Sequence, residues 1–231
     1  MVLLFLTTAC GGSDTAEPLD VYAAASLVDV LPEVDPEARF SFSGSDLAAA
    51  QIREGAPADV YASASSKYPQ ELFEQGLVEE PVTFASNRLV LVVPSESPPK
   101  VESVKDLLRP GTRLVIAAEG VPAGDYTRIA LARLGLSAAL ENVVSNEQDV
   151  NSVATKVALG EADAGLVYAT DAARNGNLRA IELPATSQPP IEYQVAVVVA
   201  SDDKDGARTF VEKLRGPEGR KALEHAGFEV P

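Results

Sequence analysis

The chain has 231 residues, of which 46% are hydrophobic and 23% are charged. This composition is typical of a globular protein with a sizeable core and excludes a disordered or collagen-like chain. The 34 acidic and 19 basic side chains give a formal net charge of −15, which repels a phosphate backbone and argues against nucleic-acid binding. With one cysteine and one histidine in the sequence, we expect no cofactor, no protein-bound metal of the usual kind and no internal disulfide.

The N-terminal segment 1–9 is an apolar run that stops at Cys10, and at nine residues it is too short to span a bilayer. Ala9, Cys10 and Gly11 resemble the end of a bacterial lipoprotein signal, although Thr7 stands where a leucine is usual. The resemblance implies that 1–18 is a signal remnant and tether, that Cys10 is lipidated, and that the protein is extracytoplasmic, either periplasmic or lipid-anchored to the outer face of the cytoplasmic membrane. The alternative is a buried N-terminal strand with a core cysteine.

Beyond residue 18, short β-type runs alternate with helical patterns, which predicts an α/β fold with mostly parallel sheets flanked by helices. Each predicted helix is followed by a glycine, as is common at helix C-termini. The predicted helices are Asp46–Glu54, Lys67–Gln75, Asp125–Leu134 and Val150–Leu159. The predicted strands are Leu19–Ala25, Ala38–Ser43, Ala58–Ser63, Arg88–Pro94, Arg113–Ala118, Ala164–Ala169, Arg179–Leu183 and Tyr193–Ala200.

Two of these strands, Arg88–Pro94 and Tyr193–Ala200, are long and strongly apolar and bracket the middle of the chain. A chain that leaves one lobe and returns to it through two such strands has an inserted second lobe. We therefore expect lobe I at 20–84 plus 194–231, lobe II at 85–193, and hinges at the two strands. One continuous doubly wound sheet is the alternative.

Ligands of open α/β sheets bind beyond the carboxyl ends of strands, where helix N-termini present free N–H groups. Five such junctions carry small or polar residues, namely those at Ser26, Ser45, Ala123, Val150 and Tyr168. Taken singly, each has a structural explanation. The two serines fit helix N-caps. The turns before Ala123 and Val150 are unspecific, and a tyrosine at a strand end is commonly a core residue.

Taken together, these stretches resemble, in order and spacing, the periplasmic molybdate-binding component of an ABC importer. The segment Leu214–Gly219, with Ala226-Gly227-Phe228 after it, looks like the closing segment of many solute-binding proteins. The matching stretches are Ala-Ala-Ser-Leu at 24–27, Phe-Ser-Gly-Ser at 42–45, Leu-Ala-Ala-Ala-Gln-Ile-Arg-Glu-Gly-Ala-Pro-Ala-Asp-Val at 47–60, Val-Pro-Ala-Gly-Asp-Tyr at 121–126, Glu-Gln-Asp-Val at 147–150 and Gly-Leu-Val-Tyr-Ala-Thr-Asp-Ala at 165–172.

The resemblance implies a two-lobe type II periplasmic-binding-protein fold that holds molybdate or tungstate between its lobes. Ser26 and Ser45 would donate hydroxyl and main-chain N–H bonds, Ala123 and Val150 main-chain N–H bonds, and Tyr168 its hydroxyl. It also implies an ABC permease and an ATPase as partners, and we expect a monomer that contacts the membrane only through its lipid anchor.

One departure from the family concerns the residue after Ser45. Relatives usually have an extra serine or threonine there, whereas this chain has Asp46, so Ser43 is a candidate to share the role of Ser45. The carboxylate of Asp46 is compatible with a nearby anion only if it turns away from it.

All five predicted binding residues are uncharged. Hydrogen bonds to a charged group contribute about 1.5–3 kcal/mol each, and a helix N-terminus carries about +0.5 charge, so six or seven donors offset much of the lost hydration of a dianion. Donors fixed on two lobes set the radius of the cavity, so we expect molybdate and tungstate to compete and the smaller sulfate to fit loosely.

Three other functions remain open. The first is the binding of another small anion, such as sulfate, phosphate or an organic carboxylate. The absence of arginine at the five junctions argues against a carboxylate. An extracellular sensor lobe, which requires a signalling module, is the second. The third is an enzyme, which we do not expect because aspartates at helix N-termini are usually caps; its candidate acid–base groups are Asp59, Asp125, Asp149 and Asp171.

Overall fold

Two five-stranded sheets carry the part of the chain that the computed structural model describes, residues 17–96 and 100–231. The predicted lipidation at Cys10 and residues 1–16 of the predicted tether lie outside the described residues. The first sheet has the order β2 (Arg39–Ser43), β1 (Asp20–Ala24), β3 (Val60–Ser63), β10 (Ile191–Val197) and β4 (Val82–Asn87). The second has the order β7 (Val143–Glu147), β6 (Leu114–Ala117), β8 (Ala164–Tyr168), β5 (Leu89–Pro94) and β9 (Leu178–Glu182).

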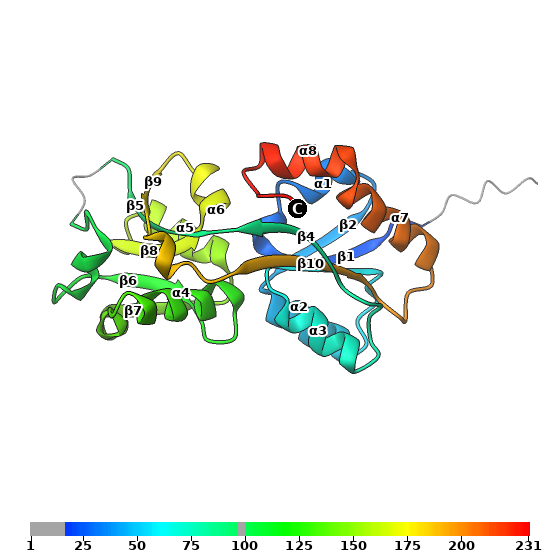
Figure 1. Ribbon diagram of the computed structural model, residues 1–231, viewed down its shortest axis with the longest axis horizontal. Coiled ribbons are helices and arrows are strands. Elements are labelled where there is room, and N and C mark those ends of the chain that lie inside the picture. The colour runs from blue at the N-terminus through cyan, green and yellow to red at the C-terminus, as the bar shows by residue number, and fades with distance from the viewer. Residues whose placement is uncertain (1–16, 97–99) are drawn as a thin grey trace, which may run out of the picture.

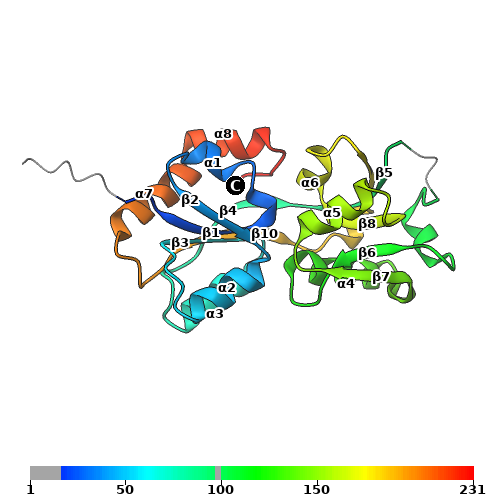
Figure 2. The ribbon, with the colours of Figure 1, turned by 180° about the vertical axis from the view of Figure 1, so that it is seen from behind.

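Helices cover both sheets (Figures 1 and 2). We call the first sheet with its helices the first half of the molecule, and the second sheet with its helices the second half. The helices of the first half are α1 (Leu31–Val34), α2 (Ser45–Arg53), α3 (Lys67–Glu74), α7 (Lys204–Arg215) and α8 (Pro217–His225). Those of the second half are α4 (Pro122–Arg133), α5 (Val150–Ala158) and α6 (Ala169–Ala173).

The chain passes between the halves twice, as Figure 1 shows. It leaves the first sheet at the end of β4 and enters the second in β5, with Arg88 between the two strands. It returns after β9 into β10, which pairs antiparallel with both β3 and β4. The lobe boundaries predicted at 84/85 and 193/194 stay a proposal.

The predicted α/β class is confirmed, but each sheet is mixed. Parallel pairs join β1 to β2 and β3, and β6 to β7 and β8. The strands that adjoin the crossings, β10 and β5, pair antiparallel with their neighbours. A mostly parallel sheet was expected because the strand–helix alternation does not reveal that a strand entering from the other half runs against its neighbours.

The eight predicted strands and four predicted helices are all present, with ends shifted by up to three residues. The glycine after each of the four helices adopts a left-handed backbone, which glycine accepts without steric cost. Two strands, β4 and β7, were not predicted. The residues of β7 alternate between half-buried and exposed, because this strand lies at the edge of its sheet, and so it lacks the apolar run of a central strand.

Two glycines allow helices of the second half to lie close to its sheet. A side chain at Gly165 in β8 would come within 2.9 Å of Val153 and Val157 of α5, and one at Gly124 in α4 would come within 2.4 Å of the Ala117 carbonyl oxygen. Real side chains essentially never approach so closely. These contacts fix the positions of α4 and α5, and therefore of their N-termini.

A buried carboxylate joins two strands of the second sheet. Asp163, just before β8, accepts hydrogen bonds from the Arg113 main-chain N–H at 2.9 Å and guanidinium at 2.9 Å, and from Lys100 Nζ at 3.1 Å. Burial raises the pKa of the carboxyl, but these bonds and charges outweigh it, so its pKa lies below its ordinary value of 3.8. Asp163 therefore stabilises the fold as a carboxylate.

We expect Asp163→Asn to lower the free energy of unfolding by about 1–3 kcal/mol at pH 7, since a charged hydrogen-bond acceptor is lost. Because the folded pKa lies below the unfolded one, this contribution is complete at pH values above 4 and is lost as the pH falls through the folded pKa. Urea denaturation at pH 7, 5 and 3 measures it. A gap between wild type and variant that is the same at pH 3 as at pH 7 would contradict this role.

No helix in the described ranges is long and apolar enough to cross a membrane.

Candidate functional site

A small pocket lies between the two halves and brings together all five predicted binding residues. The space open to the centre of a water-sized sphere is about 10 Å³, which suits a small ion and excludes a sugar or peptide. Its walls come from the ends of β1 and β3 and from the N-termini of α2, α4 and α5, and no Lys or Arg is among them. The lining residues are Ala24, Ala25, Ser26, Ser43, Gly44, Ser45, Ala64, Val121, Pro122, Ala123, Asp149, Val150 and Tyr168.

Ser26 lies in a single 3-10 turn, η1 (Ala25–Leu27), directly after β1. The interpretation of this residue as a helix N-cap is wrong, because Ala24 is the N-cap of the turn and Ser26 lies inside it. Its hydroxyl instead lies 2.9 Å from the hydroxyl of Tyr193. The Ser26 side chain is buried at the pocket wall.

Ser45 is the first residue of α2, and Gly44 is the N-cap, so the N-cap position predicted for Ser45 is also wrong. The Ser45 hydroxyl oxygen accepts a hydrogen bond of 3.0 Å from the Ala64 N–H, and its carbonyl oxygen accepts one of 2.7 Å from the Tyr61 hydroxyl. Because the hydroxyl accepts from the protein, its own hydrogen remains for a ligand.

Ala123 and Val150 lie in the first turns of α4 and α5, where N–H groups have no acceptor within the helix. In the described structure neither N–H donates to another backbone group. The neighbouring N–H of Gly124, by contrast, donates to the Val121 carbonyl at 2.9 Å. Asp149 caps α5 by accepting from the Ser152 N–H at 2.8 Å, so its carboxylate is engaged with the helix.

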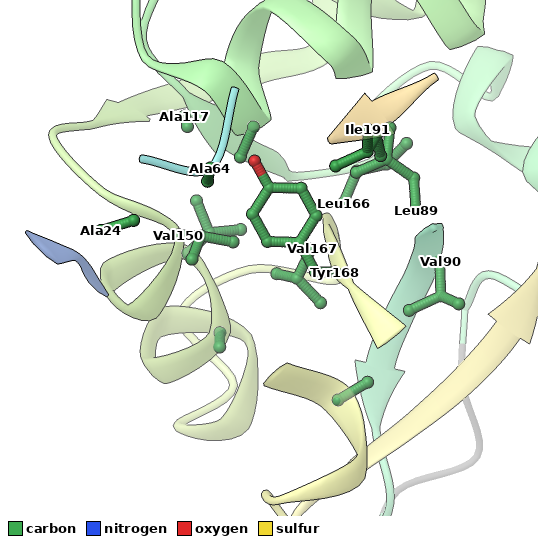
Figure 3. Close-up of a cluster of buried hydrophobic side chains, with 14 of the residues drawn as sticks. Ala24, Ala64, Leu89, Val90, Ala117, Val150, Leu166, Val167, Tyr168 and Ile191 are labelled. Atoms are coloured by element: carbon green, nitrogen blue, oxygen red, sulfur yellow. The ribbon is translucent and has the colours of Figure 1, made fainter. Parts of the chain in front are cut away.

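Tyr168 stands at the end of β8, and its side chain is 1% exposed. Its hydroxyl is buried and has no hydrogen-bond partner. A buried hydroxyl without a partner destabilises the folded protein by about 1–3 kcal/mol. Figure 3 shows the oxygen directed toward Ala64 and away from Val90. Burial raises the pKa of this phenol well above its ordinary value, so it stays protonated and can donate.

Two aspartates lie near the pocket without lining it. Burial raises the pKa of Asp46 above its ordinary value, with the charge of Asp125 adding to this. Burial also raises the pKa of Asp171, which follows Tyr168 by three residues, to about 7, against the opposing charge of Arg174. The shift of Asp171 reduces negative charge near the pocket. Asp46 is not among the residues that line the pocket.

Contacts on two sides of the pocket join the halves. On one side, the Tyr68 hydroxyl donates to the Gly120 carbonyl. On the other, the Asn151 amide donates to the Ala25 carbonyl at 2.9 Å, and Arg174 forms an ion pair of 3.0 Å with Asp29. The halves are therefore closed over the pocket.

The four aspartates considered for acid–base catalysis all accept hydrogen bonds from nearby groups of the fold. These bonds give each carboxylate a structural role at a strand or helix end. Asp59 accepts from Asp20 N at 2.8 Å and Ser201 Oγ at 2.6 Å, Asp125 from Gly120 N at 2.9 Å, Asp149 from Ser152 N at 2.8 Å, and Asp171 from Tyr168 N at 3.3 Å.

Sequence reasoning missed the contribution of β3 to the pocket. Ala64 follows this strand and lines the wall, and Ser63 and Ser65, on either side of it, are buried. The small polar run 63–66 after a buried strand was a usable signal. Ser43, the candidate to share the role of Ser45, does line the pocket, where its hydroxyl donates to the Gly44 carbonyl at 3.2 Å.

Across residues 17–96 and 100–231, no three His, Cys, Asp or Glu side chains are grouped so as to hold a metal ion.

Known proteins are similar to this chain in fold and in sequence. The family described as bacterial extracellular solute-binding protein matches residues 19–229. The molybdate-binding protein ModA of Mycobacterium tuberculosis H37Rv is 33% identical over 96% of this chain and 88% of its own, and that of Haemophilus influenzae is 34% identical over 91% and 89%. The structure of the periplasmic molybdate-binding protein of Azotobacter vinelandii superposes with a TM-score of 0.78 and 26% identity, covering 92% of this chain and 99% of the other.

Proposed function

The chain belongs to the family of bacterial extracellular solute-binding proteins, and we propose that it captures molybdate in the pocket between its halves and delivers it to an ABC importer. The fold is that of a type II periplasmic binding protein. The molybdate-binding relatives match nine-tenths or more of this chain, which supports molybdate as the ligand.

The observation that carries the proposal is the buried hydroxyl of Tyr168. It has no partner in the protein and faces a pocket into which the first turns of helices from both halves also point. A buried donor without an acceptor destabilises the protein unless a ligand accepts its hydrogen bond. An oxyanion supplies that acceptor.

The donor set favours a fully deprotonated anion. The main-chain N–H groups of Ala123 and Val150 only donate, and the Ser45 hydroxyl, which already accepts from Ala64, has its hydrogen left to donate. A protonated oxyanion would place an O–H against these donors and lose a hydrogen bond. Helix N-termini add positive potential without a counter-ion.

Tungstate has the same charge and nearly the same size as molybdate, so we propose that it binds in the same pocket. The strands Arg88–Pro94 and Tyr193–Ala200, which adjoin the two crossings, are the proposed hinges between lobe I (20–84 plus 194–231) and lobe II (85–193). An ABC permease and its ATPase are the proposed partners, and we propose that the protein acts as a monomer, without enzymatic activity, anchored through Cys10 at the outer face of the cytoplasmic membrane.

Isothermal calorimetry with molybdate, tungstate, sulfate and phosphate tests the proposal. We expect molybdate and tungstate to bind with a Kd below about 1 μM, equivalent to about −8 kcal/mol, and to compete for one site per chain. Sulfate should bind at least about tenfold more weakly, which corresponds to about 1.4 kcal/mol, and phosphate should be weaker still. Sulfate binding as tight as that of molybdate would favour the alternative of a general oxyanion carrier, and no binding of any of the four would overturn the proposal.

A further inference from the structure

Tyr193 is buried beside the pocket but is not part of its wall. It belongs to β10, at an irregularity in the pairing with β4 where the register shifts between Tyr193 and Gln194. Such a shift re-aims the side chains of a strand. Its hydroxyl lies 2.9 Å from that of Ser26, which is 167 residues away in the chain.

The Tyr193 ring is held on three sides. It meets Tyr168 at a centroid distance of 5.8 Å, Phe84 at 6.1 Å and Phe228 at 5.2 Å, each edge to face. These contacts leave the ring no room to swing. The position of its hydroxyl relative to Ser26 is therefore fixed.

The direction of the bond between the two hydroxyls decides what Ser26 offers a ligand. If Tyr193 donates, the Ser26 oxygen accepts and its own hydrogen is free to point into the pocket. If Ser26 donates, its lone pairs face the pocket and repel an anion. Burial raises the pKa of Tyr193 well above its ordinary value, while hydrogen bonding with the Ser26 and Asn87 side chains lowers it, so the phenol keeps its proton.

We propose that Tyr193 is a positioning residue for anion binding: its hydroxyl donates to Ser26 Oγ and turns the Ser26 hydroxyl hydrogen toward the bound oxyanion. This inference rests on the proposed function. A hydroxyl that is already oriented loses less freedom on binding than one that rotates, and a donor that itself accepts a hydrogen bond is polarised by it. Tyr193 thereby acts on the anion without touching it.

A double-mutant cycle in molybdate titrations tests the proposal. Tyr193→Phe keeps the ring and removes only the hydroxyl, and we expect it to weaken binding about 3- to 10-fold, as for loss of one net hydrogen bond. In a Ser26→Ala background the same change should alter Kd by less than about twofold, because no serine hydroxyl is left to orient. The matched control is Tyr22→Phe, at a half-buried tyrosine of β1 that does not line the pocket, and its Kd should equal that of wild type.

The possible results separate this inference from the proposed function. Wild type that does not bind molybdate overturns both. Wild type that binds, with Kd unchanged by Tyr193→Phe, overturns the positioning role alone. If Tyr193→Phe weakens molybdate binding equally in the Ser26 and Ser26→Ala backgrounds, the positioning role is also overturned. Tyr193 would then act through the packing of β10.

Discussion

Replacing Tyr168 with phenylalanine should weaken molybdate binding about 10- to 150-fold, the loss of one hydrogen bond of about 1.5–3 kcal/mol to a charged group. The same change should leave the free energy of unfolding of the ligand-free protein unchanged or raise it. The hydroxyl has no partner within the protein, so its removal breaks no bond of the fold and relieves a buried unsatisfied group. Calorimetry gives the Kd, and urea denaturation without ligand gives the stability.

Weaker binding together with unchanged or higher stability is expected only for a group whose hydrogen-bond partner is the ligand. Tyr22→Phe, the control used for Tyr193, should change neither quantity. If Tyr168→Phe lowers stability while Kd stays at the wild-type value, the hydroxyl serves the fold and the pocket is not the binding site.

Replacing Gly44 with alanine should weaken molybdate binding about 5- to 150-fold, because a new side chain would separate the closed halves. A Cβ at this position would lie 2.6 Å from the main-chain oxygen of Gln148, in the second half, and 2.5 Å from Oδ1 of Asp46. The Asp46 side chain can rotate, but the Gln148 oxygen belongs to the backbone before α5 and cannot move alone. Overpacking of this kind costs about 1–3 kcal/mol, which converts to the stated loss.

The backbone of Gly44 has φ −59° and ψ 140°, a conformation that alanine adopts freely, so the variant should fold normally. Gly176→Ala is the matched control, since a Cβ there meets nothing within 4 Å. Small-angle X-ray scattering with saturating molybdate should show a more open Gly44→Ala protein. Wild-type affinity in Gly44→Ala would contradict the view that binding requires the halves to close at this contact.

The general rule that ligands bind at strand ends and helix N-termini located most of the pocket from the sequence. It applied to Ser45 and Ala123, which lie between a recognisable strand and a recognisable helix. It also applied to Val150, which begins a recognisable helix, although the strand before it, β7, was not predicted. It was not applied to the run 63–66 that holds Ala64, although this run also joins a recognisable strand to a recognisable helix. It also could not tell that the Ser26 hydroxyl bonds to Tyr193 instead of capping a helix.

Contacts between distant parts of the chain explain what the sequence left open. The partner of Ser26 is set by how β10 crosses back into the first sheet, and the partner of Asp29, Arg174, lies in the other half. Local patterns carry no information on such pairings. Likewise, β4 was not predicted because its run from Val82 to Asn87 is mixed in polarity and is ordered by pairing with β10.

Diffraction at the molybdenum absorption edge, from crystals grown with molybdate, tests the central claim most directly. The account predicts one anomalous peak between the halves, with oxygens about 2.7–3.1 Å from the hydroxyls of Ser26, Ser45 and Tyr168 and from the main-chain nitrogens of Ala123 and Val150. A peak elsewhere, or a molybdate held in this pocket by Lys or Arg side chains, would contradict it.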